Sequence, residues 1–169
     1  WIAEGADGER DRSSRLLLLA RNRQGYLRLS ELLSGAFLAP RNRGRAELSR
    51  AALADGDNGG LIALSGAAAG DIGQALLAGK AAAAESAAQD WSALFPGSFY
   101  VEVQRFAQPQ AEAFAAASVA LAARLGLPLV ATHPVQFLDR DDFKAHEARV
   151  CIAEGYVLAD TRRPKHFTE

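Results

Sequence analysis

The sequence contains no methionine, not even at position 1, and a single cysteine, Cys151. One cysteine excludes an intramolecular disulfide framework and fits a reducing compartment such as the cytoplasm. Because there is no initiating methionine, we expect the 169 residues to be a piece of a longer protein.

Long apolar runs are also absent. The longest aliphatic run, Leu16 to Ala20, is far shorter than the roughly 20 residues that a membrane-spanning helix needs. Residues 1–5, WIAEG, have neither the basic nor the apolar region of a signal peptide. With 49% hydrophobic residues and a net charge of −1, the chain instead has the composition of one globular domain, and a wholly disordered protein is excluded.

No strong excess of either charge exists over the whole chain, but the charge is uneven. Residues 1–50 carry ten arginines and six acidic residues, whereas residues 51–169 have more acidic than basic residues. Arg41, Arg43 and Arg45 could meet a phosphate or an acidic partner, although a solvated loop is the favoured interpretation. No aromatic residue interleaves them, so we expect weak or absent binding of free DNA.

Hydrophobic periodicity predicts strands and helices in alternation. Strands are expected at residues 16–20, 61–64, 99–103 and 127–132, and helices at 26–40, 47–53, 72–94 with a pause near Gly79, 109–125 and 139–153. The continuous apolar run at 16–20 is typical of a strand buried on both faces. Alternation of this kind predicts an α/β fold of parallel strands, either a barrel or an open sheet, and four strands are too few to close a barrel.

The glycine spacings do not fit a nucleotide-binding loop. Gly66, Gly70 and Gly73 form GxxxGxxG rather than the dinucleotide fingerprint GxGxxG. Gly73 to Lys80 has one residue too many for a phosphate loop. We therefore interpret these glycines as sites of tight turns and close helix packing.

Local motifs for metal binding and nucleophilic catalysis are incomplete. His146-Glu147 begins like a zincin helix, but the second histidine is replaced by Val150, and Ser65 lacks the first glycine of GxSxG. Cys151 is interpreted as a core residue. Glu102, the one acid in an apolar strand, could be a general base or ligand, but pairing with Arg105 or another arginine is favoured. We expect Glu102 to be paired with an arginine, a backbone donor or water rather than exposed.

Six segments, taken in order, resemble the N-terminal region of bacterial replicative DNA polymerase III alpha subunits. They are LLLLARNRQGY at 16–26 with Leu29 and Leu32-Leu33-Ser34, GLIALSG at 60–66, FPGSFYVEVQR at 95–105, GLPLVAT at 126–132, DFKAHEARV at 142–150 with Ile152 and Gly155, and RPKHFT at 163–168. Each motif alone is weak, but together they cover nearly the whole chain.

The resemblance implies that residues 1–169 are the second part of a polymerase and histidinol phosphatase (PHP) domain, similar to a distorted (β/α)7 barrel. The family's first strands would then lie before Trp1. The polymerase palm, with its catalytic aspartates and Mg²⁺, would lie after Glu169. The family also implies a cytoplasmic scaffold role, within the alpha subunit and in docking the proofreading epsilon exonuclease subunit.

Metal-binding members of the family hold a metal cluster with histidines, acids and a cysteine, and four of those positions fall in this chain. They are Arg15, Ala67, Pro134 and Gln136. None of these residue types is a good metal ligand, and His133 lies one place away from the matching position. The resemblance therefore implies a degenerate site with no metal, no cofactor and no catalytic residue in this segment.

Two other functions stay open from the sequence. The domain could be an active metal-dependent phosphoesterase or exonuclease, which the four substitutions argue against. It could also belong to an error-prone polymerase paralogue, although GLIALSG and DFKAHEARV look more like the replicative type. Finally, if the first strands lie before Trp1, the strand at 16–20 becomes a free edge, and we expect self-association through it.

Overall fold

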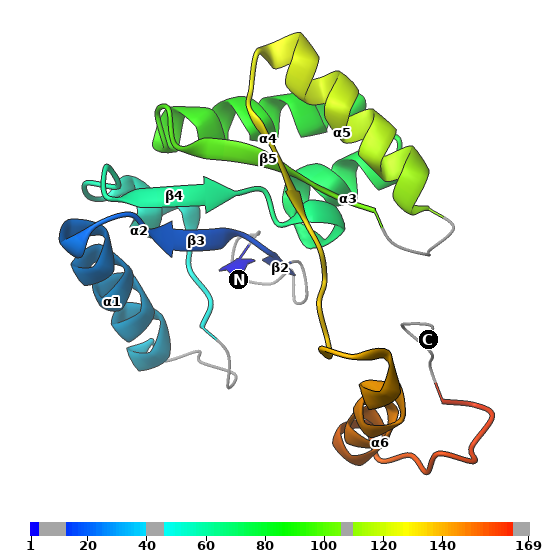
Figure 1. The fold of residues 1–169 in the computed structure, drawn as a ribbon. Coiled ribbons are helices and arrows are strands. Elements are labelled where there is room, and N and C mark those ends of the chain that lie inside the picture. The colour runs from blue at the N-terminus through cyan, green and yellow to red at the C-terminus, as the bar shows by residue number, and fades with distance from the viewer. Residues whose placement is uncertain (4–12, 40–45, 106–109, 164–169) are drawn as a thin grey trace.

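A computed structural model describes residues 1–3, 13–39, 46–105 and 110–163, so Arg41, Arg43 and Arg45 lie outside the described residues. Two sheets and a set of helices make up this part of the chain (Figure 1). The strands are β1 (Ile2–Ala3), β2 (Ser13–Ser14), β3 (Leu17–Ala20), β4 (Leu61–Leu64), β5 (Phe99–Gln104) and β6 (Leu129–Thr132). The α-helices are α1 (Arg23–Leu38), α2 (Arg50–Ala54), α3 (Asp71–Leu77), α4 (Ala81–Leu94), α5 (Ala111–Leu125) and α6 (Phe143–Glu154), with 3₁₀ turns η1 (Ala67–Ala69) and η2 (Arg140–Asp142).

The main sheet has the strand order β3-β4-β5-β6. β4 pairs with β5, and β5 with β6, in the parallel orientation that the sequence predicted. β1 and β2 form a separate antiparallel pair that the periodicity did not predict, because each strand has only two residues. None of the helices in the described part of the chain is long and apolar enough to cross a membrane.

The first strand of this sheet departs from the prediction in two respects. β3 runs antiparallel to β4, with Leu17 opposite Leu64 and Ala20 opposite Leu61. It is also not buried on both faces, because Leu17 and Leu19 are 44% and 45% exposed. The apolar run LLLLA correctly predicted a strand. It wrongly predicted that both faces of this strand are buried.

The antiparallel orientation follows from the path of the chain between β3 and β4. In a simple βαβ unit, one helix returns the chain to the amino end of the first strand, so that the next strand is parallel. Here the chain returns to the start of α1 before β4 begins: the Arg28 guanidinium donates to the carbonyl oxygens of Ala52 and Asp55, each at 2.8 Å. Gly25 packs directly against Gly60, so β4 starts beside the end of β3.

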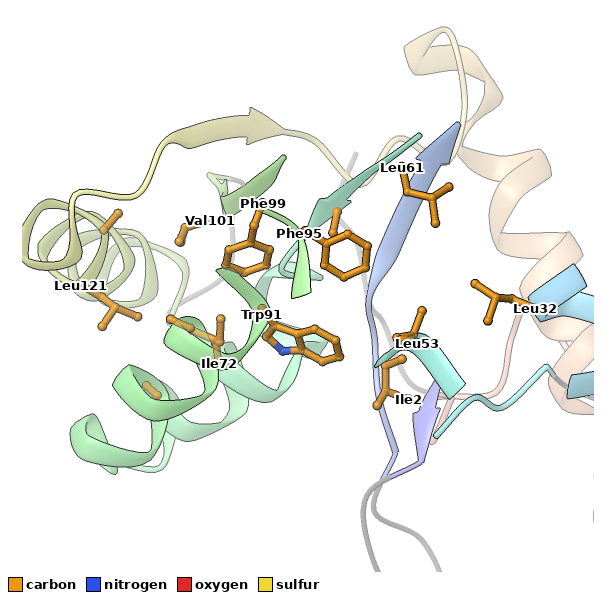
Figure 2. Packing of buried hydrophobic residues seen from close by; sticks show 14 residues of the cluster. Ile2, Leu32, Leu53, Leu61, Ile72, Trp91, Phe95, Phe99, Val101 and Leu121 are labelled. Atoms are coloured by element: carbon orange, nitrogen blue, oxygen red, sulfur yellow. The ribbon is translucent and has the colours of Figure 1, made fainter. Parts of the chain in front are cut away.

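One hydrophobic cluster joins the sheet to its helices (Figure 2). Its members on the main sheet come from β4 and β5, and they pack with side chains from α1, α2, α3, α4 and α5 and with Ile2 of β1. The fully buried members include Leu53, Leu61, Ile72, Trp91, Phe95, Val101 and Leu121. Figure 1 shows α6 apart from this sheet, at the end of a long segment that leads away from β6.

The three glycines of GxxxGxxG serve close packing, as predicted. Gly66 has a φ of +76°, which favours glycine. A Cβ at Gly66, Gly70 or Gly73 would lie 2.2, 1.8 or 2.0 Å from a backbone oxygen. The backbone around η1 is therefore packed against the segment before β3 and against the start of α3.

Ser118 gives a first prediction about stability. It lies on the buried face of α5, is 1% exposed, and its Oγ has no hydrogen-bond partner among the described residues. Replacing Ser118 by Ala removes a buried, unsatisfied hydroxyl and favours the helix, so we expect a stabilisation of about 1 kcal/mol. Urea unfolding measures this change, and a loss of stability in Ser118→Ala would contradict the assigned environment.

Candidate functional site

A group of polar side chains lies at the carboxyl ends of β4, β5 and β6. Ser65 follows β4, Glu102 and Gln104 belong to β5, and Thr132 ends β6. Parallel strands bring their carboxyl ends to the same edge of a sheet, which is where α/β proteins most often place their functional residues. This edge is therefore the first place to look for a site.

Glu102 is at the centre of the group and is 5% exposed. Its Oε1 accepts hydrogen bonds from the Gln104 amide at 3.1 Å and from the Thr132 hydroxyl. The Gln104 amide also donates to Thr132 Oγ1 at 2.9 Å, and the backbone N–H of Glu102 donates to Ser65 Oγ at 2.9 Å. A buried carboxylate is tolerated when it is hydrogen-bonded in this way.

The expectation that Glu102 is not exposed is thus confirmed, but the pairing with Arg105 or another arginine is wrong, because its side-chain partners are Thr132 and Gln104. The Arg105 side chain donates from Nε to Glu112 Oε1 at 2.8 Å, on the solvent-exposed side of the molecule. That hydrogen bond, together with the charge of Glu112, raises the pKa of Arg105 above its usual range. Alternation explains the error, because residues three apart on a strand point to opposite faces.

Arg15 and Ala67 lie beside each other at this same edge. Because β3 is antiparallel to β4, the segment before β3 reaches the carboxyl end of β4. The backbone N–H of Arg15 donates to the Ala69 carbonyl at 2.9 Å, one turn along η1 from Ala67. The Arg15 guanidinium lies 5.3 Å from the centre of the Trp1 ring, and Ala67 is buried.

Pro134 and Gln136 follow β6 and so leave the sheet from this edge. Gln136 is exposed, and its Oε1 lies 3.4 Å from Arg149 Nη2 on α6. His133 is exposed as well, whereas the preceding Thr132 points to Glu102.

The four residues at the expected ligand positions do not suit the metal cluster of metal-binding PHP domains. Arg15 brings a positive charge, Ala67 and Pro134 bring no side-chain donor, and the amide of Gln136 is a weak ligand beside Arg149. Glu102, the buried carboxylate beside Ser65 and Thr132, already accepts two hydrogen bonds. Within the described residues, no group of three His, Cys, Asp or Glu side chains is arranged to hold a metal ion.

The motif DFKAHEARV forms a second polar cluster, on α6. Glu147 is 5% exposed and forms an ion pair with Arg163, which follows the helix by several residues. His146 packs against the Phe137 ring, and its Nδ1 lies 3.1 Å from the Arg149 guanidinium. These contacts tie the segments before and after α6 to the helix, so the motif has a structural role here.

Comparisons with known proteins identify the family of this chain. A family model described as "PHP domain" matches residues 2–106. The chain belongs to the PHP domain family. The resemblance to the PHP family that was stated from the sequence motifs is therefore confirmed.

Relatives of this PHP domain are named "DNA polymerase III subunit alpha". The protein from Neisseria meningitidis is 54% identical over 160 residues, 94% of this chain and 14% of the relative. Those from Pseudomonas aeruginosa and Escherichia coli K12 are 46% and 37% identical, over 92% and 94% of the chain. The chain spans about one seventh of the length of these relatives.

Sequence reasoning found Glu102 but missed its partners. Gln104 and Thr132 lie on neighbouring strands, opposite each other in the β5–β6 register. Gln104 lies two residues after Glu102 and so shares its face, which was a usable signal. Nothing in the sequence indicated that Thr132 of β6 would donate to the Glu102 carboxylate, or that Ser65 after β4 would accept from the Glu102 backbone N–H.

The Glu102 group gives a second prediction. Glu102→Ala leaves the Thr132 hydroxyl without its acceptor and the Gln104 amide with Thr132 Oγ1 alone, so we expect a loss of about 1–3 kcal/mol in unfolding free energy. Glu102→Gln retains an acceptor oxygen and should lose less. Urea unfolding of both variants measures the difference, and a wild-type stability for Glu102→Ala would contradict the network.

Proposed function

We propose that this PHP domain is part of a replicative DNA polymerase III alpha subunit. The observation that carries the proposal is the alignment of more than nine-tenths of the chain with proteins of that name. DNA-directed DNA synthesis, with its Mg²⁺ and catalytic aspartates, would then belong to the part of the subunit that follows this segment. The domain would act in the cytoplasm.

Within that subunit, we propose a non-catalytic scaffold role. The support is chemical, since Arg15, Ala67, Pro134 and Gln136 do not supply the ligands that metal-dependent phosphoester hydrolysis requires. Glu102 is buried and engaged by Thr132 and Gln104, which suits a structural carboxylate. An active phosphoesterase and an error-prone polymerase paralogue are the alternatives to this proposal.

The main sheet has two outer strands, which supports the proposal that it is part of a larger sheet. Among the described residues, β3 and β6 each pair with one strand only. We propose that residues 1–169 form one fragment of a distorted (β/α)7 barrel, in which further strands of the longer protein complete the sheet. The parallel strands β4, β5 and β6, with helices packed on one face, are compatible with such a barrel.

The docking role would be to hold the proofreading epsilon exonuclease subunit. This part of the proposal rests on the family resemblance. DNA itself would be held by the rest of the alpha subunit, since the chain has a net charge of −1 and no basic stripe with interleaved aromatic residues.

The test is a binding titration between this chain and the exonuclease subunit of the same bacterium, followed by calorimetry and analytical ultracentrifugation. A one-to-one complex with micromolar or tighter affinity is expected. Absence of a complex at about 100 µM of each protein would remove the docking role, while leaving the assignment to the alpha subunit intact. A parallel titration with a short DNA duplex at moderate salt should show no comparable binding.

A further inference from the structure

The loop at residues 55–60, between α2 and β4, carries the one Asn-Gly dipeptide of the sequence, Asn58-Gly59. In a freely moving chain, the backbone nitrogen of such a glycine attacks the side-chain carbonyl carbon of the asparagine. Ammonia leaves, and water opens the resulting succinimide to aspartate or isoaspartate. Asn-Gly is the dipeptide at which this reaction is easiest, because glycine has no side chain to shield its nitrogen or to restrict the backbone.

In the folded chain, both reacting groups of this dipeptide are held by hydrogen bonds. The attacking group, the Gly59 N–H, donates to Asp57 Oδ1 at 2.7 Å. The leaving group, the Asn58 side-chain amide, donates to the Leu53 carbonyl oxygen at 2.7 Å. The negative charge of Asp57 also opposes the loss of the Gly59 proton that the attack requires. The reaction therefore needs both hydrogen bonds to break.

The loop is fixed at both of its ends and from one side. Leu53 and Leu61 flank it and are fully buried in the hydrophobic cluster (Figure 2). Asn58 is itself 8% exposed, and its backbone carbonyl accepts from the Leu61 N–H at 2.8 Å. From α1, the Gln24 amide donates to Asp57 Oδ2 at 2.6 Å. Release of Asn58 therefore requires local opening of the loop rather than the rotation of one side chain.

We propose that Asn58 is a site of spontaneous deamidation that the fold protects, and that opening of the 55–60 loop converts it to aspartate or isoaspartate. The reaction consumes one water and releases one ammonia, so it needs no enzyme and no cofactor. The protecting groups are the Asp57 carboxylate and the Leu53 carbonyl. This inference rests on residues in the interior of the chain and does not depend on the polymerase assignment.

The product does not fit the closed loop. A carboxylate at position 58 has no N–H for the Leu53 carbonyl, and Asn58 Oδ1 is buried where no described residue offers it a donor. Isoaspartate also lengthens the backbone just before Gly60, whose close contact with Gly25 leaves no room for a shift. Each opening that ends in deamidation is therefore irreversible and leaves a loop that closes less well.

The rate of Asn58 deamidation in the full chain, measured by peptide mapping and mass spectrometry at neutral pH, tests the proposal. The reference is the peptide acetyl-DGDNGGL-amide, which has the same local sequence without the fold. Asn58 should react at least about tenfold more slowly in the folded chain than in the peptide. In denaturing urea, the chain and the peptide should react at the same rate. Deamidation of the folded chain at the peptide's rate would overturn the proposal.

Variants at two aspartates of the loop test the hydrogen bond to Gly59. Asp57→Ala removes the acceptor and should speed deamidation of Asn58 by about tenfold, whereas Asp57→Asn retains an acceptor oxygen and should speed it less. Asp55→Ala is the matched control, because it makes the same change of charge in the same loop and leaves this hydrogen bond in place. Equal rates for Asp57→Ala and Asp55→Ala would contradict protection by Asp57.

Asn58→Asp makes the product directly and tests whether the closed loop rejects it. We expect this variant to unfold at a lower urea concentration than the wild type, and the N–H groups of Gly59 and Leu61 to exchange their hydrogens faster. A wild-type urea midpoint together with wild-type exchange would show that aspartate fits the closed loop, and the proposed irreversible opening would then be wrong.

Discussion

Replacing Gly25 by Ala should destabilise the protein by about 3 kcal/mol. A Cβ at this position would lie 1.8 Å from the Gly60 carbonyl oxygen. The Cβ is fixed to the helix backbone and the oxygen belongs to the backbone before β4, so neither can move aside without shifting the chain. Asn22 adds to the constraint, because its side chain caps α1 by accepting from the Gly25 N–H at 2.9 Å. In Gly25→Ala, the clash would therefore push the start of α1 away from the start of β4.

Gly35 provides the matched control on the same helix. A Cβ there meets no other atom within 4 Å. Gly35→Ala should stabilise the protein by up to about 1 kcal/mol, because alanine has the higher helix propensity. Urea unfolding of both variants tests the pair. If the two substitutions change stability in the same direction, the close contact between Gly25 and Gly60 is not present in solution.

The second large effect is expected at Trp91. Its side chain is fully buried in α4, and its indole N–H donates to Asp71 Oδ2 at 2.8 Å. The Arg50 guanidinium, which forms an ion pair with Asp71, lies 4.3 Å from the centre of the indole ring. Trp91→Ala should therefore cost about 4 kcal/mol, since it leaves a cavity and removes a donor from a partly buried carboxylate.

Trp91→Phe separates these two contributions. It retains an aromatic ring in the core but loses the indole N–H, so we expect a cost of about 2 kcal/mol. Leu77→Ala, at a half-exposed position on the neighbouring helix α3, serves as the control and should cost less than about 1 kcal/mol. Thermal and urea unfolding measure all three variants. A cost for Trp91→Phe equal to that of Trp91→Ala would mean that the hydrogen bond, and not the packing, dominates.

Much of the fold could be predicted from local patterns. The apolar tetrad at 61–64 and the strand from Phe99 gave β4 and β5, and the glycine after Leu125 marked the end of α5. These signals are local, because periodicity and capping act over a few residues. The 3₁₀ turn at Arg140–Asp142, with its capping box, was included in the predicted helix at 139–153.

The orientation of β3 could not be predicted in the same way. It depends on the contact between Gly25 and Gly60, which are 35 residues apart in the sequence, and periodicity carries no information about such pairs. The motifs around both glycines were visible, but only as a family resemblance. Their physical meaning, a backbone contact too close for any side chain, emerged from the structure.

The candidate site likewise has features that local sequence predicts and features that depend on distant contacts. The proposal that Arg15 and Ala67 replace metal ligands came from the family resemblance and from residue type, because residue type decides whether a side chain can hold a metal. The partners of Glu102 could not be predicted from the sequence, since Thr132 comes from a different strand and Arg105 was the nearer candidate in the sequence. The register between β5 and β6 is what selects Thr132 and Gln104.

Metal content tests the scaffold proposal most directly. The purified chain is incubated with Zn²⁺ and Mn²⁺, desalted, and measured by inductively coupled plasma mass spectrometry. With Arg15, Ala67, Pro134 and Gln136 at the ligand positions, we expect less than about 0.1 equivalent of either metal, because none of these side chains is a strong ligand. Retention of close to one equivalent of tightly held metal would contradict the account and favour an active phosphoesterase.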